Sequence, residues 1–339
     1  MIEILEITPA IIEEILQNTQ RESLPYFEYG FITESVLKSS FRLSLQHSVI
    51  KESTISKAIY KEGKLAGYII LERADFDSEI FGYNVHRIAF LDIFKTGQNE
   101  SSGIIQALLS VINQSESDAK IKYLTFTINS NNTNLLYLFT ILLHNRFYFI
   151  NTLLTFSHRK EENFNSHFQV KESRKDFLIR ESHAGDASAI ITIASNSHKI
   201  NRFHLDPNLD KAKCDLLHAT SARNSVLNGF VDIIYVAENN GNVIGYYSGK
   251  KKNLQGSGLI IGEAAISAVS EKFRGCGVFN MLDNALLGWF NSNTDFAEMG
   301  TYINNLPVHR TWIKKNKTMV RGTYQLARFN HDLKIPQVY

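Results

Sequence analysis

The sequence predicts an α/β chain that consists of two copies of one α+β fold. Three observations carry this prediction: the same order of strand and helix patterns occurs twice, 44% of the 339 residues are hydrophobic, and a polar segment separates the two copies. That segment, residues 161–176, has few apolar side chains to bury and is predicted to be a linker. We therefore expect one domain at residues 1–160 and a second at residues 177–332.

The first copy opens with a strand and two helices and continues with strands rich in apolar and β-branched residues. A Glu62-Gly63 pair between two apolar runs predicts a turn. The expected elements are a strand at 3–7, helices at 10–19 and 33–45, strands at 55–61, 64–73 and 86–94, a helix at 102–114, a strand at 121–128, a helix at 133–144 and a hairpin at 147–157.

The second copy repeats this order of elements. Asn239-Asn240-Gly241 lies between two apolar runs, which is a strong hairpin signal. The expected elements are a strand at 177–180, helices at 185–195 and 209–226, strands at 231–238, 243–250 and 259–269, a helix from 278, a strand at 296–303, a helix at 304–315 and a hairpin at 319–329.

Composition and charge narrow the classes of function. The formal net charge is +2 and the charges are interspersed. The sequence therefore lacks the clustered positive charge that would predict a nucleic-acid partner. Cys214 and Cys276 lie far apart without metal-ligand spacing, which favours a reducing cytoplasm and predicts neither disulfide nor metal. The most apolar run, residues 135–143, is too short to span a bilayer, and the first residues lack a secretory pattern. We expect a cytoplasmic protein with small-molecule partners and no membrane partner.

The most informative feature is a loop with two glycines in the second copy. The apolar strand at 259–269 leads to Arg274-Gly275-Cys276-Gly277, and a helical apolar pattern begins at once with Val278. A helix start leaves about four N–H groups without partners and carries partial positive charge. The glycines permit positive φ and close approach of a ligand, and Arg274 adds a forked, charged donor. This order predicts a pyrophosphate site; an ordinary strand-to-helix turn is the alternative.

The loop resembles the pyrophosphate loop of the GNAT superfamily of acyl-CoA-dependent N-acyltransferases, where the strand ends in R/Q-x-x-G-x-G/A. Arg274, Gly277 and Phe279 stand at the three motif positions, and Phe279 departs from the small residue of the pattern. In that family a strand, an asparagine and a helix follow in order. Residues 296–303 and Asn305 match this order, so the resemblance covers the C-terminal half of the chain.

The resemblance has consequences for both fold and ligand. It implies tandem GNAT-like domains, each with a mixed, mostly antiparallel sheet flanked by helices, and acyl-CoA as co-substrate without a metal. The acyl-CoA contacts that it implies are at Ile266, Ala268, Val269, Arg274, Gly275, Cys276, Gly277, Val278, Phe279 and Asn305.

The first copy lacks this loop. Residues 95–103 contain no Arg-Gly-x-Gly and place an acidic residue, Glu100, before the helix, so we expect that this copy does not bind CoA. Its distinctive segment, residues 75–83, resembles the D-S-E-x-F-G signature of two-domain bacterial nucleotide-sugar N-acyltransferases, which act on dTDP-linked amino-deoxy sugars. A structured loop with an aromatic core residue is the alternative. The resemblance implies acceptor contacts from Asp77, Ser78, Phe81 and Tyr83.

A segment of the second copy, residues 201–207, resembles the R-F-H-x-D-P segment of the same sugar-modifying group. Arg202 suits a nucleotide phosphate, Phe203 suits stacking on a base or sugar, and a histidine such as His204 suits acid–base chemistry. The resemblance implies acceptor contacts from Arg202, Phe203 and Asp206. Surface or capping roles are the alternative for each of these residues.

Acyl transfer from CoA to an amine needs a donor for the tetrahedral oxyanion and a route for the proton of the amine. The family supplies the donor from a backbone N–H of the strand before the loop, here at Ile266 or Ala268. Glu263, early in this strand, is the first candidate base, followed by His204 and then His309. A sugar amine with a lowered pKa needs no dedicated base, which is the alternative.

The leaving thiolate also needs a proton. The family often uses a tyrosine on the helix after the asparagine, but Trp312 stands at that position, and its indole N–H is too weak an acid. We therefore interpret Trp312 as a packing residue. Tyr302 or another nearby hydroxyl group is a candidate donor of this proton, and departure of the thiolate unassisted or through water is the alternative.

These observations together predict an acyl-CoA-dependent N-acyltransferase that modifies the amino group of a dTDP-linked amino-dideoxy sugar for surface polysaccharide or O-antigen assembly. The donor is acetyl-CoA or a larger acyl-CoA. Two alternatives stay open: an N-acetyltransferase of an aminoglycoside, peptide or small thiol compound, and a non-catalytic acyl-CoA sensor. A monomer and a homodimer are both compatible with the sequence.

Overall fold

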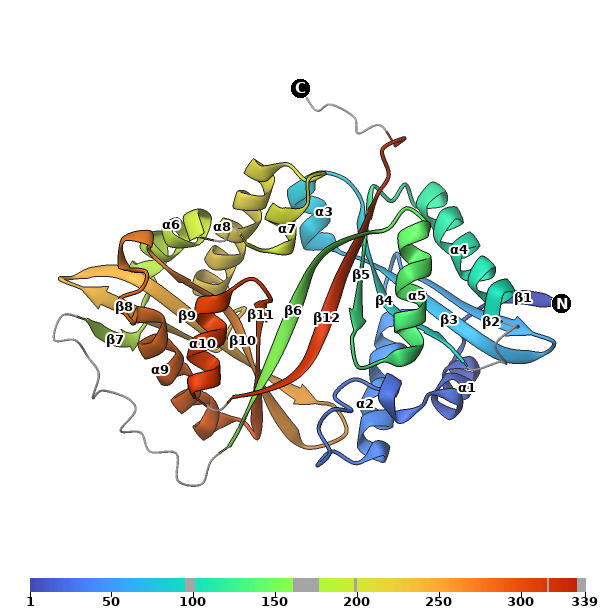
Figure 1. Cartoon of the computed structure of the whole chain (residues 1–339), viewed down its shortest axis with the longest axis horizontal. Coiled ribbons are helices and arrows are strands. Elements are labelled where there is room, and N and C mark those ends of the chain that lie inside the picture. Colours follow the sequence, from blue (N-terminus) through green and yellow to red (C-terminus); the bar gives the residue numbers. More distant parts are fainter. Residues whose placement is uncertain (95–100, 161–176, 198–199, 316, 334–339) are drawn as a thin grey trace. The chain divides into compact units, whose positions relative to one another are not determined.

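The computed structural model describes residues 1–94, 101–160, 177–197, 200–315 and 317–333. The chain forms two compact units (Figure 1). Unit 1 comprises Met1–Thr152, Gln255–Ser257 and Arg321–Tyr339, and unit 2 comprises Leu153–Leu254 and Gly258–Val320. The expected linker at residues 161–176 lies outside the described residues.

Unit 1 is a mixed sheet with helices on both faces. Its strands follow the order β1-β2-β3-β4-β5-β12, with every pair antiparallel except β4 and β5. The elements of the first half are β1 (Ile2–Glu6), α1 (Pro9–Asn18), η1 (Arg21–Ser23), α2 (Glu34–Val49), β2 (Ile55–Lys61), β3 (Lys64–Arg73), α3 (Asp75–Phe81), β4 (Val85–Ile93), α4 (Ser101–Asp118), β5 (Tyr123–Asn129), α5 (Thr133–His144) and β6 (Tyr148–Arg159).

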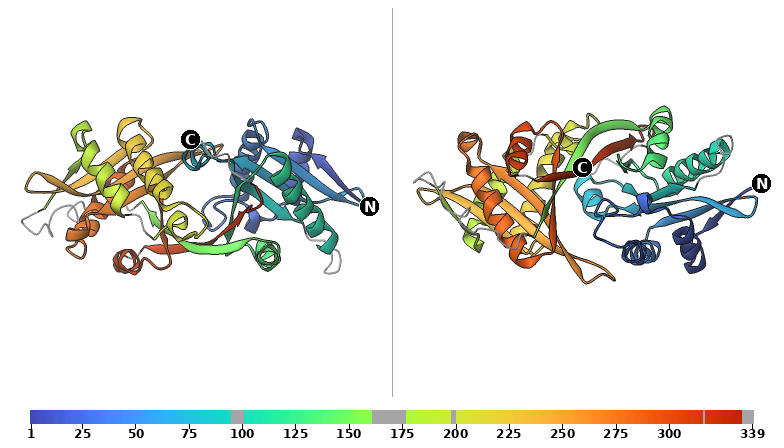
Figure 2. Two further views of the ribbon diagram at one scale, coloured as in Figure 1. Left: turned by 90° about the horizontal axis from the view of Figure 1, so that it is seen from above. Right: turned by 60° about the horizontal axis from the view of Figure 1, so that its bottom comes forward.

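Local signals and periodic burial explain these helices. Helix α1 begins after Thr8, whose hydroxyl accepts a hydrogen bond from the Ile11 N–H, and Pro9 occupies the first helical position. Helices α4 and α5 bury their apolar sides in one core cluster with strands β2 to β5. Helix α2 lies on the opposite face, where Phe41 packs edge-on against Phe90 of β4. Figure 2 shows the helices on both sides of the sheet.

Unit 2 repeats this architecture. Its strand order is β7-β8-β9-β10-β11-β6, with every pair antiparallel except β10 and β11. The elements of the second half are β7 (Leu178–Glu181), η3 (Ala184–Asp186), α6 (Ala187–Ser197), α7 (Arg202–Leu205), α8 (Lys211–Leu227), β8 (Ile233–Asn239), β9 (Asn242–Leu254), β10 (Leu259–Val269), η4 (Glu271–Phe273), α9 (Val278–Asn293), β11 (Phe296–Tyr302), α10 (Leu306–Lys314) and β12 (Thr318–Phe329).

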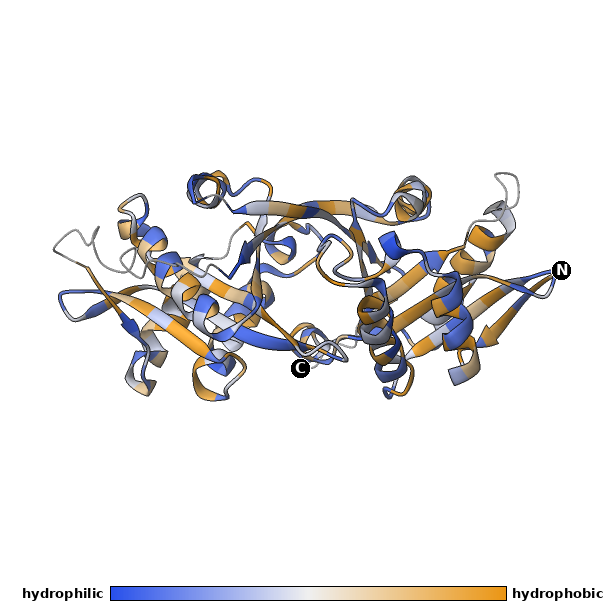
Figure 3. Ribbon diagram, turned by 90° about the horizontal axis from the view of Figure 1, so that it is seen from below, coloured by the Kyte–Doolittle hydropathy of each residue, from blue (hydrophilic) through white to orange (hydrophobic). Residues whose placement is uncertain are grey.

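The sheet of unit 2 is also covered on both faces. Consecutive residues of β9 point to opposite faces of the sheet, each of which carries its own hydrophobic core. Tyr246 packs with α6 and α8, whereas Tyr247 packs with α9 and α10. Close packing of α9 requires a glycine at position 262, since a Cβ there would lie 2.4 Å from the Phe290 ring. Figure 3 shows mainly hydrophobic strands in the middle of each sheet, beside helices that alternate hydrophobic and hydrophilic residues.

The two halves exchange their last strands. We expected hairpins at 147–157 and 319–329, but each segment is one long strand, and these two predictions are wrong. Residues 153–159 of β6 pair with β11, and residues 323–329 of β12 pair with β5. Each half therefore completes the sheet of the other half. A single sequence shows the alternation of a strand but not its partner, so a local hairpin was the wrong choice.

The structure contains two short helices that we did not expect. Helix α3 occupies the segment for which a structured loop was the alternative, with Asp75 and Asp77 in its first turn and Gly82 at φ 72° as its C-cap. Helix α7 begins at Asn201, whose side-chain oxygen accepts hydrogen bonds from the N–H groups of Phe203 and His204. Both helices lie in segments that the sequence analysis singled out as candidate acceptor contacts.

A buried histidine of unit 1 predicts sensitivity to acid. Burial, reinforced by Arg73, lowers the pKa of His86 from 6.5 to about 4, although Asp75 opposes the shift. The unfolded chain therefore binds a proton at this residue below pH 6.5, whereas the folded chain does not until about pH 4, and folding stability falls over this interval. We expect a loss of about 2 kcal/mol near pH 5 relative to pH 7, measured by urea unfolding.

The variant His86→Leu removes this titrating group and should lessen the decline in the free energy of unfolding between pH 7 and pH 5, whereas the part due to buried His158, whose pKa is also lowered to about 4, should remain. The exposed His47 of α2 offers the matched control, because the same substitution there removes a solvated histidine. An unchanged pH slope in His86→Leu would contradict the assignment.

Candidate active site

The loop between β10 and α9 has the backbone conformation that the sequence predicts. Gly275 has φ +78° and Gly277 has φ +84°, values that residues other than glycine rarely adopt. A Cβ at either position would nevertheless meet open space. Gly277 is the N-cap of α9, and the first turn contains no acidic residue. The first helical bond runs from the Met281 N–H to the Gly277 carbonyl, at 3.2 Å. The preceding amides at the helix start can therefore receive an anion.

The residues around the glycines divide into core and surface. Val278 is buried, and the ring of Phe279 packs against Tyr247 and Trp312, with centroids 5.6 and 6.4 Å away. The large residue at the motif position of Phe279 is thus accommodated by the core of unit 2. The Arg274 side chain lies on the surface, where its Nε donates to the Val269 carbonyl at 3.3 Å.

Strand β10 is bulged and leaves its parallel neighbour before the loop. Within the described strands, β10 pairs with β11 only at residues 261–263, whereas its pairing with β9 continues to Val269. The register with β9 shifts between Ala264 and Ser267. At this bulge the Ile266 N–H donates to the Ser248 hydroxyl at 3.1 Å. The Ile266 amide, one of the two expected oxyanion donors, is therefore already engaged.

The hydrogen bonds between β9 and β10 also determine the direction of the other N–H groups near the end of β10. The Ser270 N–H donates to the Ile244 carbonyl at 2.8 Å, and Ala268 is paired with Tyr246 two residues earlier. Since antiparallel hydrogen bonding alternates, the Ala268 N–H faces β9, and those of Ser267 and Val269 face the edge that β11 has left. The geometry thus disfavours Ile266 and Ala268 as oxyanion donors and favours Ser267 and Val269.

Glu263 does not have the environment of a general base. Its carboxylate lies 3.0 Å from the Lys250 ammonium and 3.5 Å from that of Lys252, both on β9. Burial alone would raise the pKa of Glu263, but the two lysines hold it below its ordinary value. A carboxylate that binds protons so weakly is a poor base near neutral pH. The sequence suggested neither lysine as a partner, because the contacts arise from strand register.

His204 is similarly engaged within α7 and α8. Its Nε2 lies 2.8 Å from an Asp215 oxygen, and its Nδ1 lies 3.0 Å from the amide nitrogen of Asn201. The same amide nitrogen lies 2.8 Å from Nε2 of His218, which stacks on His204. Since an amide nitrogen only donates, His204 accepts at Nδ1 and carries its proton on Nε2. Both ring nitrogens are therefore occupied, and His204 must break a contact to act as a base.

Two expected acceptor contacts of this segment are buried. Asp206 is 0% exposed and accepts the Asn208 N–H at 2.9 Å, which shapes the turn before α8. Phe203 is 8% exposed, and the Arg202 guanidinium stacks on its ring at 4.5 Å. This burial favours the capping alternative for Asp206 and Phe203, whose acceptor contacts stay predictions. Arg202 is half-buried and is the strongest candidate of the three.

The strand and helix after α9 have the expected order. Asn305 is the N-cap residue of α10, and its side-chain amide donates to the Thr301 hydroxyl at 2.9 Å. Trp312 is 1% exposed within the core, which confirms its interpretation as a packing residue. His309 lies with Nε2 3.0 Å from the Tyr302 carbonyl, so the weakest base candidate is also engaged. Tyr302 itself is half-buried at the end of β11, and its role as an acid stays a prediction.

A buried ion cluster links α9 to α10 and to the residues that follow α10. Asp283 of α9 and Lys317 are each 1% exposed, with their charged atoms 2.8 Å apart, and Lys315 approaches the same carboxylate at 2.7 Å. The Trp312 indole N–H donates to Asp283 at 3.1 Å. Burial lowers the pKa of Lys317 to about 8 although Asp283 opposes this shift. Sequence reasoning missed this cluster, and an aspartate among the apolar residues of α9 was its only signal.

The motif of the first copy is largely structural. Ser78 is 3% exposed, and its hydroxyl donates to the Ala74 carbonyl at 2.7 Å and accepts the Val85 N–H at 3.0 Å. Phe81 is fully buried and stacks on Tyr83. These contacts favour the structural alternative for Ser78 and Phe81, because their side chains anchor α3 to β4. Asp77 and Tyr83 are half-buried and stay candidates.

Three further expectations can be compared with the described residues. The loop at 95–100, which carries the prediction that the first copy does not bind CoA, lies outside them. Among the residues that the structure describes, no three His, Cys, Asp or Glu side chains gather as a metal site would require. Every described helix is too short or too polar to cross a bilayer.

The comparisons with solved structures agree with this geometry and confirm the predicted fold class: the chain has the GNAT fold in tandem. A GCN5-related N-acetyltransferase from Sphaerobacter thermophilus matches with a TM-score of 0.61 at 10% identity, over 97% of this chain and 95% of that one. A tandem GNAT protein from the clavulanic acid biosynthesis pathway matches with a TM-score of 0.58 at 11% identity, over 97% and 98%.

A third match is a GCN5-related glucosamine N-acetyltransferase region of a fungal multi-domain beta-N-acetylglucosaminidase. Its TM-score is 0.61 at 10% identity, over 97% of this chain and 38% of that one. No protein-family model matches the sequence, and no curated protein matches it significantly. At these sequence identities the similarity establishes the fold alone and does not identify the substrate.

Proposed function

We propose that the chain is an acyl-CoA-dependent N-acyltransferase and that unit 2 binds the coenzyme. The observation that carries this proposal is the pair of positive-φ glycines, Gly275 and Gly277, at the uncapped start of α9, directly after a bulged strand that leaves its neighbour. The amides at the start of α9 would hold the pyrophosphate, and Arg274 would add charge on the solvent side.

The chemistry of the proposed reaction is aminolysis of a thioester. An amine attacks the thioester carbonyl and a C–N bond forms; the oxyanion then collapses as the C–S bond breaks, and the proton that the amine nitrogen loses neutralises the leaving thiolate. We assign the oxyanion donor to the N–H of Ser267 or Val269, on the edge of β10 that faces away from β9. The engaged side chains of Glu263 and His204 favour an amine that reaches its neutral form without a dedicated base.

We further propose an amino sugar carried on a nucleotide as the acceptor. The two segments that resemble the dTDP-amino-sugar acyltransferases support this choice, and the glucosamine acceptor named for one structural neighbour is of related chemistry. Since burial favours structural roles for Ser78, Phe81, Phe203 and Asp206, the proposed contacts to the acceptor are Asp77, Tyr83 and Arg202. Products of this kind serve surface polysaccharide assembly.

The test is release of CoA thiol from acetyl-CoA in the presence of a panel of amines. We expect turnover with dTDP-linked and UDP-linked amino sugars to exceed that with glucosamine, an aminoglycoside, a peptide amine or a small thiol compound. The variant Arg274→Glu should weaken the use of acetyl-CoA with every acceptor.

A specific observation favours a second candidate, a non-catalytic acyl-CoA sensor: both leading base candidates are engaged by neighbours, and Trp312 replaces the expected acid. Saturable CoA binding together with background thiol release for all amines would support the sensor and contradict the enzyme.

A further inference from the structure

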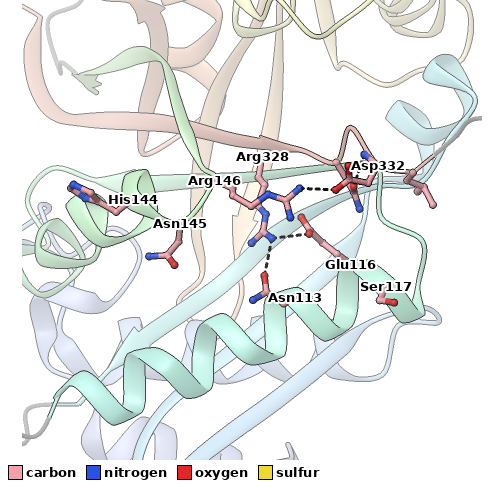
Figure 4. Close-up of a pocket in the computed structure, with 10 residues that line it drawn as sticks. Asn113, Glu116, Ser117, His144, Asn145, Arg146, Arg328 and Asp332 are labelled. Atoms are coloured by element: carbon pink, nitrogen blue, oxygen red, sulfur yellow. Dashed lines mark hydrogen bonds and ion pairs between the residues drawn. The ribbon is translucent and has the colours of Figure 1, made fainter.

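Unit 1 contains a polar cavity of about 530 Å³ that none of the predicted site residues lines. Its walls come from the C-terminal ends of α4 and α5 and from the end of β12 and the residues after it. Figure 4 shows the side chains of Asn113, Glu116, Arg146, Arg328 and Asp332 close together, whereas the side chain of Asn145 points away from them. The volume is within the range of small-molecule sites, roughly 300 to 1,000 Å³.

Arg328 of β12 forms the buried part of this cavity. The residue is 2% exposed, and its Nη2 donates to the Asn113 side-chain oxygen at 2.7 Å and lies 2.9 Å from a Glu116 oxygen. Its Nε is shut off from solvent and has no acceptor among the described residues. A buried donor without an acceptor is costly, so the protein by itself leaves this guanidinium incompletely satisfied.

Arg146 stands at the rim, in a backbone conformation that arginine does not favour. It follows α5 with φ 69°, and the next N–H, of Phe147, donates back to the Leu142 carbonyl at 3.2 Å. This helix ending usually has glycine or asparagine at the left-handed position, and another residue there costs on the order of 1 kcal/mol. The ion pair that Arg146 forms, 3.8 Å from Asp332, is exposed and contributes less than about 1 kcal/mol. That contact does not explain why an arginine stands here.

The two guanidinium groups also face each other. Figure 4 shows them side by side, with Arg328 directed at Asn113 and Glu116 and Arg146 directed at Asp332. Burial lowers the pKa of Arg328; Glu116 opposes this shift, and the nearby Arg146 adds to it to a smaller extent. An anion between the two arginines would relieve this repulsion and could accept forked hydrogen bonds from both.

We propose that this cavity binds a phosphorylated, hydroxyl-rich small molecule, with its phosphate between Arg146 and Arg328. The Glu116 carboxylate and the carboxamide of Asn113 supply acceptors and donors for hydroxyl groups. Sugar phosphates and nucleoside diphosphates share this chemistry. The site lies wholly in unit 1 and does not depend on the function proposed for unit 2.

The experiment is calorimetric titration of the full chain with inorganic phosphate, ribose phosphate and dTDP. We expect saturable binding of at least one organic phosphate, tighter than that of inorganic phosphate. In Arg146→Gly this affinity should fall at least tenfold, while the melting temperature without ligand stays equal or rises, since glycine relieves the positive φ. A merely structural arginine would leave affinity unchanged. Arg146→Lys keeps the positive charge but loses the forked guanidinium, so this variant should bind the organic phosphate with intermediate affinity.

The variant Arg274→Glu separates this site from the loop of unit 2, because binding in the cavity should persist when the pyrophosphate loop is altered. Loss of binding in Arg274→Glu, or equal affinity of the native chain and Arg146→Gly, would overturn the proposal. Absence of saturable binding for all three probes would do the same. Equal affinity for inorganic and organic phosphates would overturn the part of the proposal that assigns hydroxyl contacts.

Discussion

Replacement of Gly277 by valine is expected to weaken CoA binding at least about tenfold while unit 2 stays folded. Gly277 has φ +84°, and a β-branched residue in this region costs roughly 1–3 kcal/mol. Since a Cβ at this position meets open space, the cost is conformational rather than steric. The chain can escape it by rotating the peptide groups that present the first amides of α9, which removes them from the pyrophosphate. Calorimetric titration with CoA measures the effect.

The control for this prediction is Gly229→Val. Gly229 follows α8 at φ +68° and also faces open space, so the substitution imposes similar backbone strain away from the loop. We expect this control to lower the melting temperature slightly and to leave CoA affinity unchanged. If Gly277→Val bound CoA as tightly as the control does, the pyrophosphate would have to lie elsewhere.

The second large effect is expected at the buried ion cluster. Replacement of Asp283 by asparagine removes the only carboxylate that contacts Lys317 among the described residues, and Lys317 is 1% exposed. An unpaired buried ammonium typically costs 3–5 kcal/mol, a large part of the total stability of a domain. We expect a loss of about 3 kcal/mol or more in the free energy of unfolding in urea. Because a buried, unpaired lysine has a depressed pKa, this variant should regain stability as the pH rises above 7.

A double variant tests the physical cause. Asp283→Asn with Lys317→Met removes both charges, so it should be more stable than Asp283→Asn alone by at least about 1 kcal/mol. Lys317→Met alone is the matched control, because Lys315 still neutralises the carboxylate. Equal stability of the double and the single variant would show that the loss comes from packing and not from the unpaired charge.

The fold could be predicted in most of its elements but not in its strand partners. Periodic burial and turn residues located the helices and strands within a few residues, as for the helix predicted at 133–144 and observed at Thr133–His144. The partners of β6 and β12 could not be predicted, because an alternating segment fits more than one sheet edge. The short helices α3 and α7 were missed because each depends on a cap rather than on periodicity.

The candidate site was predicted well at the glycine loop and poorly at the oxyanion donors of β10 and at the side chains. Gly275 and Gly277 have the positive φ that the spacing indicated. Glu263 and His204 looked available in the sequence, but neighbours from other strands and helices engage both. Composition gives no warning of this, because an acidic or imidazole side chain looks the same whether it is free or paired.

By itself, the sequence determined that two similar α+β copies occur, that the second carries a loop with two glycines, and that this loop precedes a helix. These are local properties, since glycine φ, helix periodicity and capping depend on residues a few positions apart. Only the tertiary structure decided the exchanged strands, the amides that the bulge in β10 leaves on its outer edge, and the two arginines of unit 1 at one cavity. Such features depend on burial and hydrogen-bond partners, which bring together residues such as Asn113 and Arg328 from distant parts of the chain.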